Sequence, residues 1–216
     1  MNTNKDLMIP DNDCRLCPRL AAFRDQNREK FPNEFNAPVP SFGDVGAQLL
    51  IVGLAPGLKG ANFSGRPFTG DFAGELLYGT LIKYGFAKGE FKARPDDGLE
   101  LVNCRITNAV RCVPPENKPI GAEINTCLQF LTNQIENMPN LKVIISLGLV
   151  SHNAVLKAHG VKLSAHKFAH KTEHHLSKNL LLIDSYHCSK YNTSTKRLTE
   201  PMFHEVFKLA KSKLEG

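Results

Sequence analysis

Four short apolar segments recur along the chain, and each is followed by a stretch with helical periodicity. They read QLLIVG from Gln48, LVNCRITNAV from Leu101, KVIISLG from Lys142 and NLLLIDSYH from Asn179. Leucine and β-branched residues in runs of this length are typical of buried strands. After the second segment, for example, Ile124, Leu128 and Leu131 are spaced to form one face of a helix. Strands that alternate with helices predict an α/β fold with a mostly parallel sheet between helical layers.

The length of 216 residues suits one well-buried domain and is short for two. Residues 1–46 carry a Cys-x-x-Cys motif and end in FPNEFNAPVPSFGDVG, whose proline and glycine density is typical of an ordered connection. We therefore expect a single domain spanning residues 1–216. In folds of this kind, ligands bind beyond the carboxyl ends of the strands, where the polar loops of this chain lie.

The formal net charge of +6 favours a polyanionic partner, and nucleic acid is the first candidate. The first residues, MNTNKDLMIPDND, contain no apolar run like that of a signal peptide. No window approaches the roughly 18 consecutive apolar residues that span a membrane. These features predict a soluble cytoplasmic protein with no membrane partner.

A glycine-rich loop follows the first predicted strand in LLIVGLAPGLKGANFSGRPFTGD, residues 49–71. Glycines after a strand are typical of phosphate-binding loops, but neither GxxxxGK[ST] nor GxGxxG opening into a helix is present. Nucleotide binding and plain turn formation therefore remain as alternatives. The end of the loop indicates more, because Phe68 has the pattern of an exposed ring and Asp71 precedes a predicted helix. Asp71 is placed either to cap that helix or to face a substrate.

Six cysteines in a reducing compartment indicate metal or redox chemistry more than a disulfide framework. Cys14 and Cys17 form one pair, while Cys112 and Cys127 delimit a loop that runs from a strand into a helix. Two thiolate pairs suit zinc or an iron–sulfur cluster, and the long second interval fits zinc poorly. A thioredoxin-type motif is disfavoured because no strand precedes Cys14. Cys104, inside a strand, is expected to be an inert core thiol.

Three long motifs resemble those of the uracil-DNA glycosylase superfamily, specifically its type B, or family 5, branch. They are GLAPGLKGANFSGRPFTGD, TNAVRCVPPENKPIGAEINTC and SYHCSKYNTSTKRLT, and the likeness extends from Cys14 to the C-terminal helix. The resemblance implies a three-layer α/β/α sandwich with a central four-stranded parallel sheet. It also implies a 4Fe-4S cluster on Cys14, Cys17, Cys112 and Cys127. The implied activity is excision of uracil, with hypoxanthine and other deaminated or damaged bases as further substrates, by a monomer acting on double-stranded DNA.

A glycosylase must flip its target nucleotide out of the duplex and hold the base in a pocket. By resemblance, Phe68 is the stacking face for the base and Asn108 reads its Watson–Crick edge with a side-chain amide. His187 matches the motif histidine whose donor stabilises negative charge on the departing base. Strand-end capping is the plainer alternative for Asn108, and a structural role is the plainer one for His187.

The water-activating acid is the least settled residue of the predicted site. Sister families carry an Asp or Asn where this chain has Ala55, which with Gly53 is expected to bind substrate through the loop. Asp71 matches the TGD element of the branch and is the best candidate to orient water or to stabilise an oxocarbenium-like sugar. Asn62 also matches the branch and is predicted to touch the sugar or the water. Because no lysine is singled out as a nucleophile, we expect a monofunctional glycosylase that leaves an abasic site.

The loop SKYNTSTKRL combines hydroxyl and basic side chains that suit phosphate contacts. The DNA-binding residues predicted in this loop are Ser189, Lys190, Tyr191, Asn192, Lys196 and Arg197. Tyr191 is the predicted wedge that fills the gap left by the flipped base. The family motif reads His-Pro-Ser at this point, and here Cys188 replaces the proline, which removes a constraint on the backbone beside His187.

A further stretch, AHKFAHKTEHH, places His166, His170, His174 and His175 at steps that would suit metal ligands on one helix face. Without an acidic or cysteine partner in the pattern, a basic loop near DNA is the favoured interpretation. Two other functions remain open at this stage. One is a non-catalytic iron–sulfur module that binds DNA damage, and the other is an iron–sulfur enzyme that binds nucleotides.

Overall fold

The computed structural model describes residues 7–216, so the first six residues of the predicted domain lie outside the described part. Its main sheet has six strands in the order β1-β5-β2-β6-β8-β7. Their bounds are β1 Phe42–Gly43, β5 Cys104–Asn108, β2 Leu49–Gly53, β6 Val143–Leu147, β8 Leu180–Ser185 and β7 Glu173–Ser177. The inner four strands are parallel, as the sequence predicts, and β1 and β7 add an antiparallel strand at each edge.

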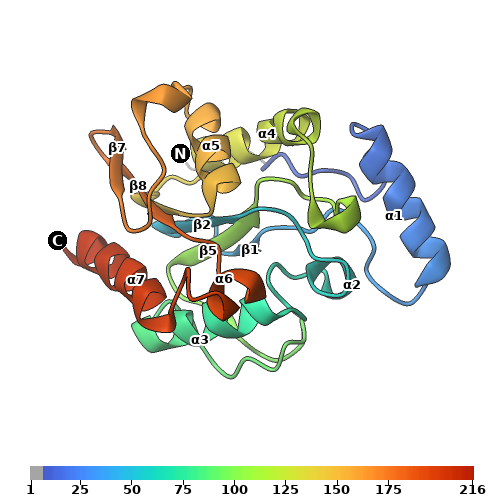
Figure 1. Cartoon of the computed structure of the whole chain (residues 1–216), viewed down its shortest axis with the longest axis horizontal. Helices are drawn as coiled ribbons and strands as arrows, with labels where there is room; N and C mark the ends of the chain where they lie inside the picture. Colours follow the sequence, from blue (N-terminus) through green and yellow to red (C-terminus); the bar gives the residue numbers. More distant parts are fainter. Residues whose placement is uncertain (1–6) are drawn as a thin grey trace, which may run out of the picture.

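Helices cover both faces of this sheet and make it the middle of three layers (Figure 1). The main helices are α1 Pro18–Lys30, α3 Phe72–Tyr84, α4 Gly121–Glu136, α5 Leu149–Ala158 and α7 Glu200–Glu215. Successive residues of a strand point to opposite faces, so Leu49 and Ile51 of β2 pack in the core beneath α3 and α7. Leu50 and Val52 pack on the other face, in the core beneath α4 and α5. Apolar runs without alternation are therefore explained by burial on both sides.

The second predicted strand, LVNCRITNAV, is divided in the structure. Leu101 belongs to β4 (Glu100–Leu101), which pairs with β3 (Ala87–Lys88) in a separate small sheet. Between β4 and β5, Asn103 has a positive φ of 49° and its side-chain oxygen accepts the N–H of Gln48 at 2.8 Å. A left-handed residue turns the chain, and asparagine tolerates that conformation better than most residues do. The central strand therefore begins at Cys104.

The N-terminal segment packs at one side of the sandwich, where α1 lies beside the elements that follow β5 (Figure 1). Leu20 of α1 forms a third, small core with Val110, Cys127 and Phe130. The remaining short elements are the helices α2 Ala61–Ser64 and α6 Lys190–Ser194 and the 3₁₀ turns η1 Pro115–Asn117 and η2 Leu163–Ala165. Among the helices of residues 7–216, none is both long and apolar enough to cross a membrane.

Candidate active site

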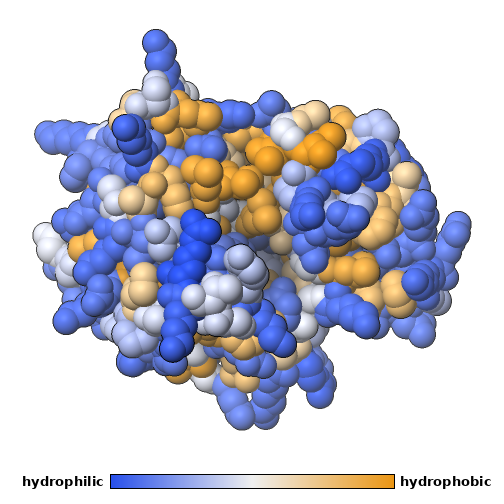
Figure 2. All heavy atoms as spheres, in the orientation of Figure 1, coloured by the Kyte–Doolittle hydropathy of each residue, from blue (hydrophilic) through white to orange (hydrophobic). Residues whose placement is uncertain are grey.

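A cavity of about 730 Å³ opens beyond the carboxyl ends of β2, β6 and β8. Its lining comes from the loops after these three strands, from the start of α3 and α5, and from α6. Figure 2 shows apolar side chains gathered on this face beside a hollow. Sequence reasoning placed the site at this edge of the sheet, and the cavity lies there.

Asp71 lies at the start of α3, at the edge of the cavity. It is the N-cap of α3, where its side chain accepts the Gly74 N–H at 3.2 Å, and it also lines the cavity. Burial raises the pKa of this carboxyl above its usual range, and the N–H groups of Gly74 and Ala73 oppose that rise. The glycine-rich loop packs closely against the Asp71 side chain because residue 60 is glycine. A Cβ at that position would lie 2.7 Å from an oxygen of Asp71. Asp71 is the one carboxylate among the described residues that line the cavity.

His187 lines the same cavity from the loop after β8. Burial lowers the pKa of its imidazole to about 4, so the ring is neutral at pH 7. The backbone around it is fixed, because the Asn192 side-chain amide donates to the His187 carbonyl at 2.8 Å. A neutral imidazole carries one N–H donor, which is the group that a developing anion requires.

Phe68 is buried, with 6% of its surface exposed, so the prediction of an exposed ring is wrong. The reason is Gly53 at the end of β2. A Cβ at Gly53 would lie 2.6 Å from the Phe68 ring and 2.3 Å from the side-chain oxygen of Asn108. Phe68, Gly53 and Asn108 therefore meet at the end of β2 and are not among the residues that line the cavity. Asn108 is buried at the end of β5.

The other two loop residues of the predicted site have different surroundings. Ala55 lines the cavity. Asn62 does not: it is 1% exposed, and its amide donates to the side-chain oxygen of Asn36 at 2.8 Å. The Asn36 amide in turn donates to the Phe31 carbonyl at 2.7 Å. Asn62 thus anchors the connection before β1, and the structure gives it no contact with the cavity.

The predicted DNA loop forms α6 and the turn that follows it. Ser189 caps α6 by accepting the Asn192 N–H, and both residues line the cavity together with Lys190 and Arg197. Arg197 lies over the Tyr186 ring, 4.8 Å from its centroid. Tyr191 and Lys196 are outside the lining, and Tyr191 is 71% exposed. The segment therefore presents basic groups at the rim and one ring to solvent.

Cys188, the residue in place of the motif proline, is fully buried beside His187. Its thiol donates to the Ala73 carbonyl at 3.6 Å, and burial raises the pKa of this thiol. The contact joins the loop after β8 to the first turn of α3. The constraint that proline would supply by its ring is replaced here by packing and a weak hydrogen bond.

Several residues that line the cavity were not among the predicted site residues. Phe72, the residue after Asp71, is 43% exposed and lines the cavity, as do Phe168 and Tyr186. The segment Leu147 to Val150, where β6 ends and α5 begins, adds an apolar wall. For Tyr186, directly after β8, and for the residues after β6, this position was the available signal, because residues at such ends face the ligand site in parallel sheets. Phe72 and Phe168 carry no such signal.

The four cysteines of the predicted cluster line one small cavity between α1 and the start of α4. Apolar side chains of Leu20, Val110 and Phe130 close it. Burial raises the pKa of Cys112 to about 12 and that of Cys127 to about 11, and the charges of Cys14 and Cys17 add to both rises. The Arg111 N–H donates to the Cys127 sulfur at 3.4 Å. All six cysteines, which lie within the described residues, are free thiols.

Comparison with known proteins gives the family. Residues 40–211 match the family model described as the uracil DNA glycosylase superfamily. The chain belongs to this superfamily. Relatives named type-5 uracil-DNA glycosylase are similar over most of the chain. The protein from Thermus thermophilus is 41% identical over 203 residues, covering 92% of each chain. The protein from Mycobacterium leprae is 37% identical, and the match covers 94% of this chain and 92% of that protein. The protein from Pyrobaculum aerophilum is 33% identical, and the match covers 92% of this chain and 88% of that protein.

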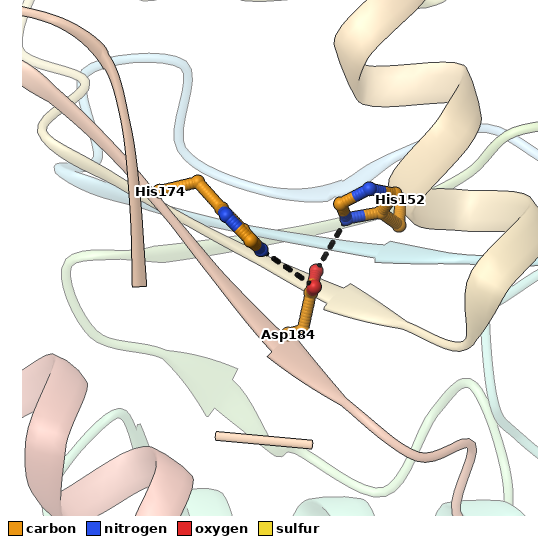
Figure 3. A group of neighbouring side chains, drawn as sticks. All are labelled: His152, His174 and Asp184. Atoms are coloured by element: carbon orange, nitrogen blue, oxygen red, sulfur yellow. Dashed lines mark hydrogen bonds and ion pairs between the residues drawn. The ribbon is translucent and has the colours of Figure 1, made fainter. Parts of the chain in front are cut away.

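The histidine-rich stretch of this superfamily member forms no helix. It runs from η2 through a loop into β7, so His174 is buried while His175 points outward. His174 and His152 of α5 both contact Asp184 of β8, each at 2.8 Å (Figure 3). Ser146 donates to the same carboxylate at 2.7 Å. With three donors the buried carboxylate is satisfied, and the triad joins α5, β7 and β8.

Proposed function

We propose that this protein is a monofunctional DNA-repair glycosylase that flips uracil out of duplex DNA and hydrolyses the bond between base and sugar. The observation that carries the proposal is the presence of one carboxylate, Asp71, and one neutral histidine, His187, in the same cavity. The relatives named type-5 uracil-DNA glycosylase support the choice of base. The cavity, at about 730 Å³, has the size of a small-molecule site and accommodates a nucleoside.

In this reaction the bond from C1′ to the base nitrogen breaks, and the electron pair leaves with the base. The neutral imidazole of His187 donates its N–H to the base oxygen on which negative charge develops. Asp71 faces the sugar, where its negative charge stabilises the oxocarbenium-like centre. A water molecule then adds its oxygen to C1′, and the raised pKa of Asp71 makes this carboxylate a suitable acceptor for the proton of the water. The products are the free base and an abasic site.

Recognition of the base is assigned to the residues at the ends of β2 and β5. Phe68 supplies an aromatic face and Asn108 an amide that both donates and accepts. Ala55 lines the cavity and leaves room for the base because its side chain is small. Gly53 lets the Phe68 ring and the Asn108 amide come close to the end of β2. Asn62, which the sequence placed among the catalytic groups, is assigned the structural role that its bond to Asn36 supports.

Contacts to the DNA backbone are assigned to α6 and the residues around it. Ser189, Lys190, Asn192 and Arg197 stand at the cavity, where hydroxyl, amide and basic groups bind phosphate. Lys196 lies just outside. Tyr191, exposed beside them, is assigned the wedge that replaces the flipped nucleotide in the stack.

The four cysteines are assigned a 4Fe-4S cluster, since four thiols around one apolar cavity are the donor set that such clusters use. When bound, the cluster supplies a covalent link between α1 and the residues on either side of η1. We infer that the link is structural, because Cys14, Cys17, Cys112 and Cys127 lie in a cavity separate from that of Asp71 and His187. Zinc in place of iron after anaerobic purification would contradict this assignment.

The test is release of uracil from a duplex oligonucleotide that carries a single U, followed by alkaline cleavage of the abasic site. The wild-type protein is expected to release uracil, and a panel with hypoxanthine and single-stranded DNA defines its range. Lack of release, with tight binding to the same duplex, would favour a non-catalytic damage-binding module. Undiminished release by both Asp71→Asn and His187→Gln would refute the assigned site.

A further inference from the structure

Arg24 of α1 is buried, with 1% of its surface exposed. The described residues accept only part of the hydrogen bonds that its guanidinium can donate. Its Nη1 group donates to the Cys14 carbonyl at 3.0 Å. Within residues 7–216, its Nε and Nη2 groups find no hydrogen-bond partner. A guanidinium stays charged at any pH at which proteins fold, and a buried charge is costly unless an anion accompanies it. The side chain therefore requires a negative partner.

The neighbouring carboxylates do not fill this role. Asp25 pairs with Arg15, and Asp13 pairs with Arg28. Both carboxylates are at the surface, with 39% and 66% of their side chains exposed. The positive charge of Arg24 makes a small contribution to lowering the pKa of each, but neither accepts a hydrogen bond from it.

The placement of Arg24 on α1 directs it toward the cysteines. Arg24 follows Cys17 by seven residues, and Leu20 lies between them, so all three share one face of the helix. Cys17 and Leu20 line the cysteine cavity. The Nη1 contact with the Cys14 carbonyl and this shared helix face place the guanidinium beside the segment that carries Cys14 and Cys17.

We propose that Arg24 is the counter-charge of the iron–sulfur cluster and a positioning residue for it. Four thiolates leave such a cluster anionic, and the unpartnered Nε–H and Nη2–H groups would donate to its sulfur atoms or to the ligating thiolates. Positive charge and hydrogen bonds at the sulfurs favour the more negative, reduced state, so Arg24 raises the reduction potential. It also slows loss of the cluster, since partners outside the ligand shell typically change metal affinity by about 10- to 100-fold. The inference rests on the cluster assigned under the proposed function.

The test compares Arg24→Met and Arg24→Lys with the wild-type protein, each reconstituted with iron and sulfide. Arg105 provides the matched control, because it is a half-buried arginine whose Nε also has no partner among the described residues, but it lies on β5 and does not line the cavity of the four cluster cysteines. For Arg24→Met we expect about tenfold faster bleaching of the visible absorbance under a chelator and a more negative reduction potential. Arg24→Lys keeps the charge, so its potential is expected to lie between those of the other two proteins. Arg105→Met is expected to match the wild-type protein in both measurements.

The unfolding temperature of the iron-free protein distinguishes a counter-charge role of Arg24 from a role in packing alone. In the apo-protein the charge of Arg24 has no anionic partner, so Arg24→Met is expected to unfold at the same temperature as wild type or higher. In the reconstituted protein the same variant is expected to unfold at a lower temperature. Equal destabilisation of both forms, an unchanged potential, or a chain that binds no iron would each overturn the proposal. Uracil release is assayed in parallel, so an inactive protein whose cluster still responds to Arg24→Met refutes the proposed function alone.

Discussion

The ring of Phe68 stacks against the imidazole of His187, with centroids 6.1 Å apart and planes inclined by 29°. The two residues come from the loops after β2 and β8, which are separated in the sheet by β6. Phe68 reaches this position with a positive φ of 54°, a conformation that aromatic residues rarely adopt. Burial is the physical reason for the lowered pKa of the imidazole, and the Phe68 ring covers one side of it. The placement of Phe68 thus contributes to the surroundings of the neutral donor in the proposed mechanism.

Replacement of Asp71 separates its two roles. Asparagine caps a helix as well as aspartate does, so Asp71→Asn preserves the start of α3, whereas Asp71→Ala removes the cap at a cost of about 1 kcal/mol. Because burial raises the pKa of Asp71, keeping its carboxyl ionised at pH 7 lowers the free energy of unfolding. Asp71→Asn is therefore expected to be at least as stable as wild type at pH 7 by urea unfolding. Its rate of uracil release is expected to fall by about 10²-fold or more in single-turnover assays.

The pH dependence of stability tests the environment of His187. Its folded-state pKa is about 4 against an ordinary 6.5, so the folded state favours the neutral ring. The corresponding stability is fully present above pH 6.5 and is lost as the pH falls toward 4, by up to about 3 kcal/mol. In urea unfolding across this range, His187→Gln is expected to lose less stability than wild type. Identical pH profiles for the two proteins would show that the imidazole is not held neutral.

The inner strands and the helices could be predicted because the pattern that indicates each of them lies within its own segment of the sequence. Each inner strand is an apolar run buried on both faces, and each helix that follows has its own periodicity. The edge strands could not be predicted in this way: β1 has only two residues, and β7 includes the histidines, which give no apolar alternation. Their pairing is decided by neighbours distant in sequence.

The sequence predicted which loops form the candidate site, but not how each side chain is placed in it. Motif residues indicated Asp71 and His187, and both face the cavity. The burial of Phe68 depends on the missing Cβ of Gly53, and the engagement of Asn62 depends on Asn36. Neither relation has a sequence pattern, because each partner is supplied by another part of the fold. The His152–Asp184–His174 triad likewise joins three elements that only the tertiary structure brings together.

Gly53→Ala is expected to disturb the pocket because the added methyl would overlap both Asn108 and Phe68. The strand must then shift or the two side chains must turn, and overpacking of this kind typically costs about 1–3 kcal/mol. Uracil release is expected to fall more than stability does, since both displaced residues belong to the proposed base pocket. Gly79→Ala on the exposed face of α3 is the control, because nothing lies within 4 Å of its added Cβ. It is expected to retain activity and to gain up to about 1 kcal/mol in unfolding free energy from helix propensity.

Asp97 holds the loop of Phe68 through Arg66. The two side chains form a buried, bidentate ion pair at 2.8 and 2.7 Å, which keeps the pKa of Asp97 well below its usual range. Asp97→Asn would leave a buried guanidinium without its counter-charge, at a cost of about 3–5 kcal/mol in unfolding free energy. The exposed pair of Arg94 and Asp96 in the same segment is the control, and Asp96→Asn is expected to change little. Equal effects from the two substitutions in urea unfolding would contradict this account of the loop.

Lys190 is expected to contribute a sequence-independent contact to phosphate at the rim of the cavity. Each neutralised phosphate releases counterions, so the logarithm of the DNA association constant falls linearly with the logarithm of the salt concentration. Lys190→Ala is therefore expected to weaken binding to uracil-containing and normal duplexes alike and to reduce the salt slope by about 1. Lys178, in the turn between β7 and β8 at the opposite end of β8 from the cavity, offers a control of equal charge. A fluorescence-anisotropy titration in which Lys178→Ala lowers the slope as much as Lys190→Ala would show that only net charge is being measured.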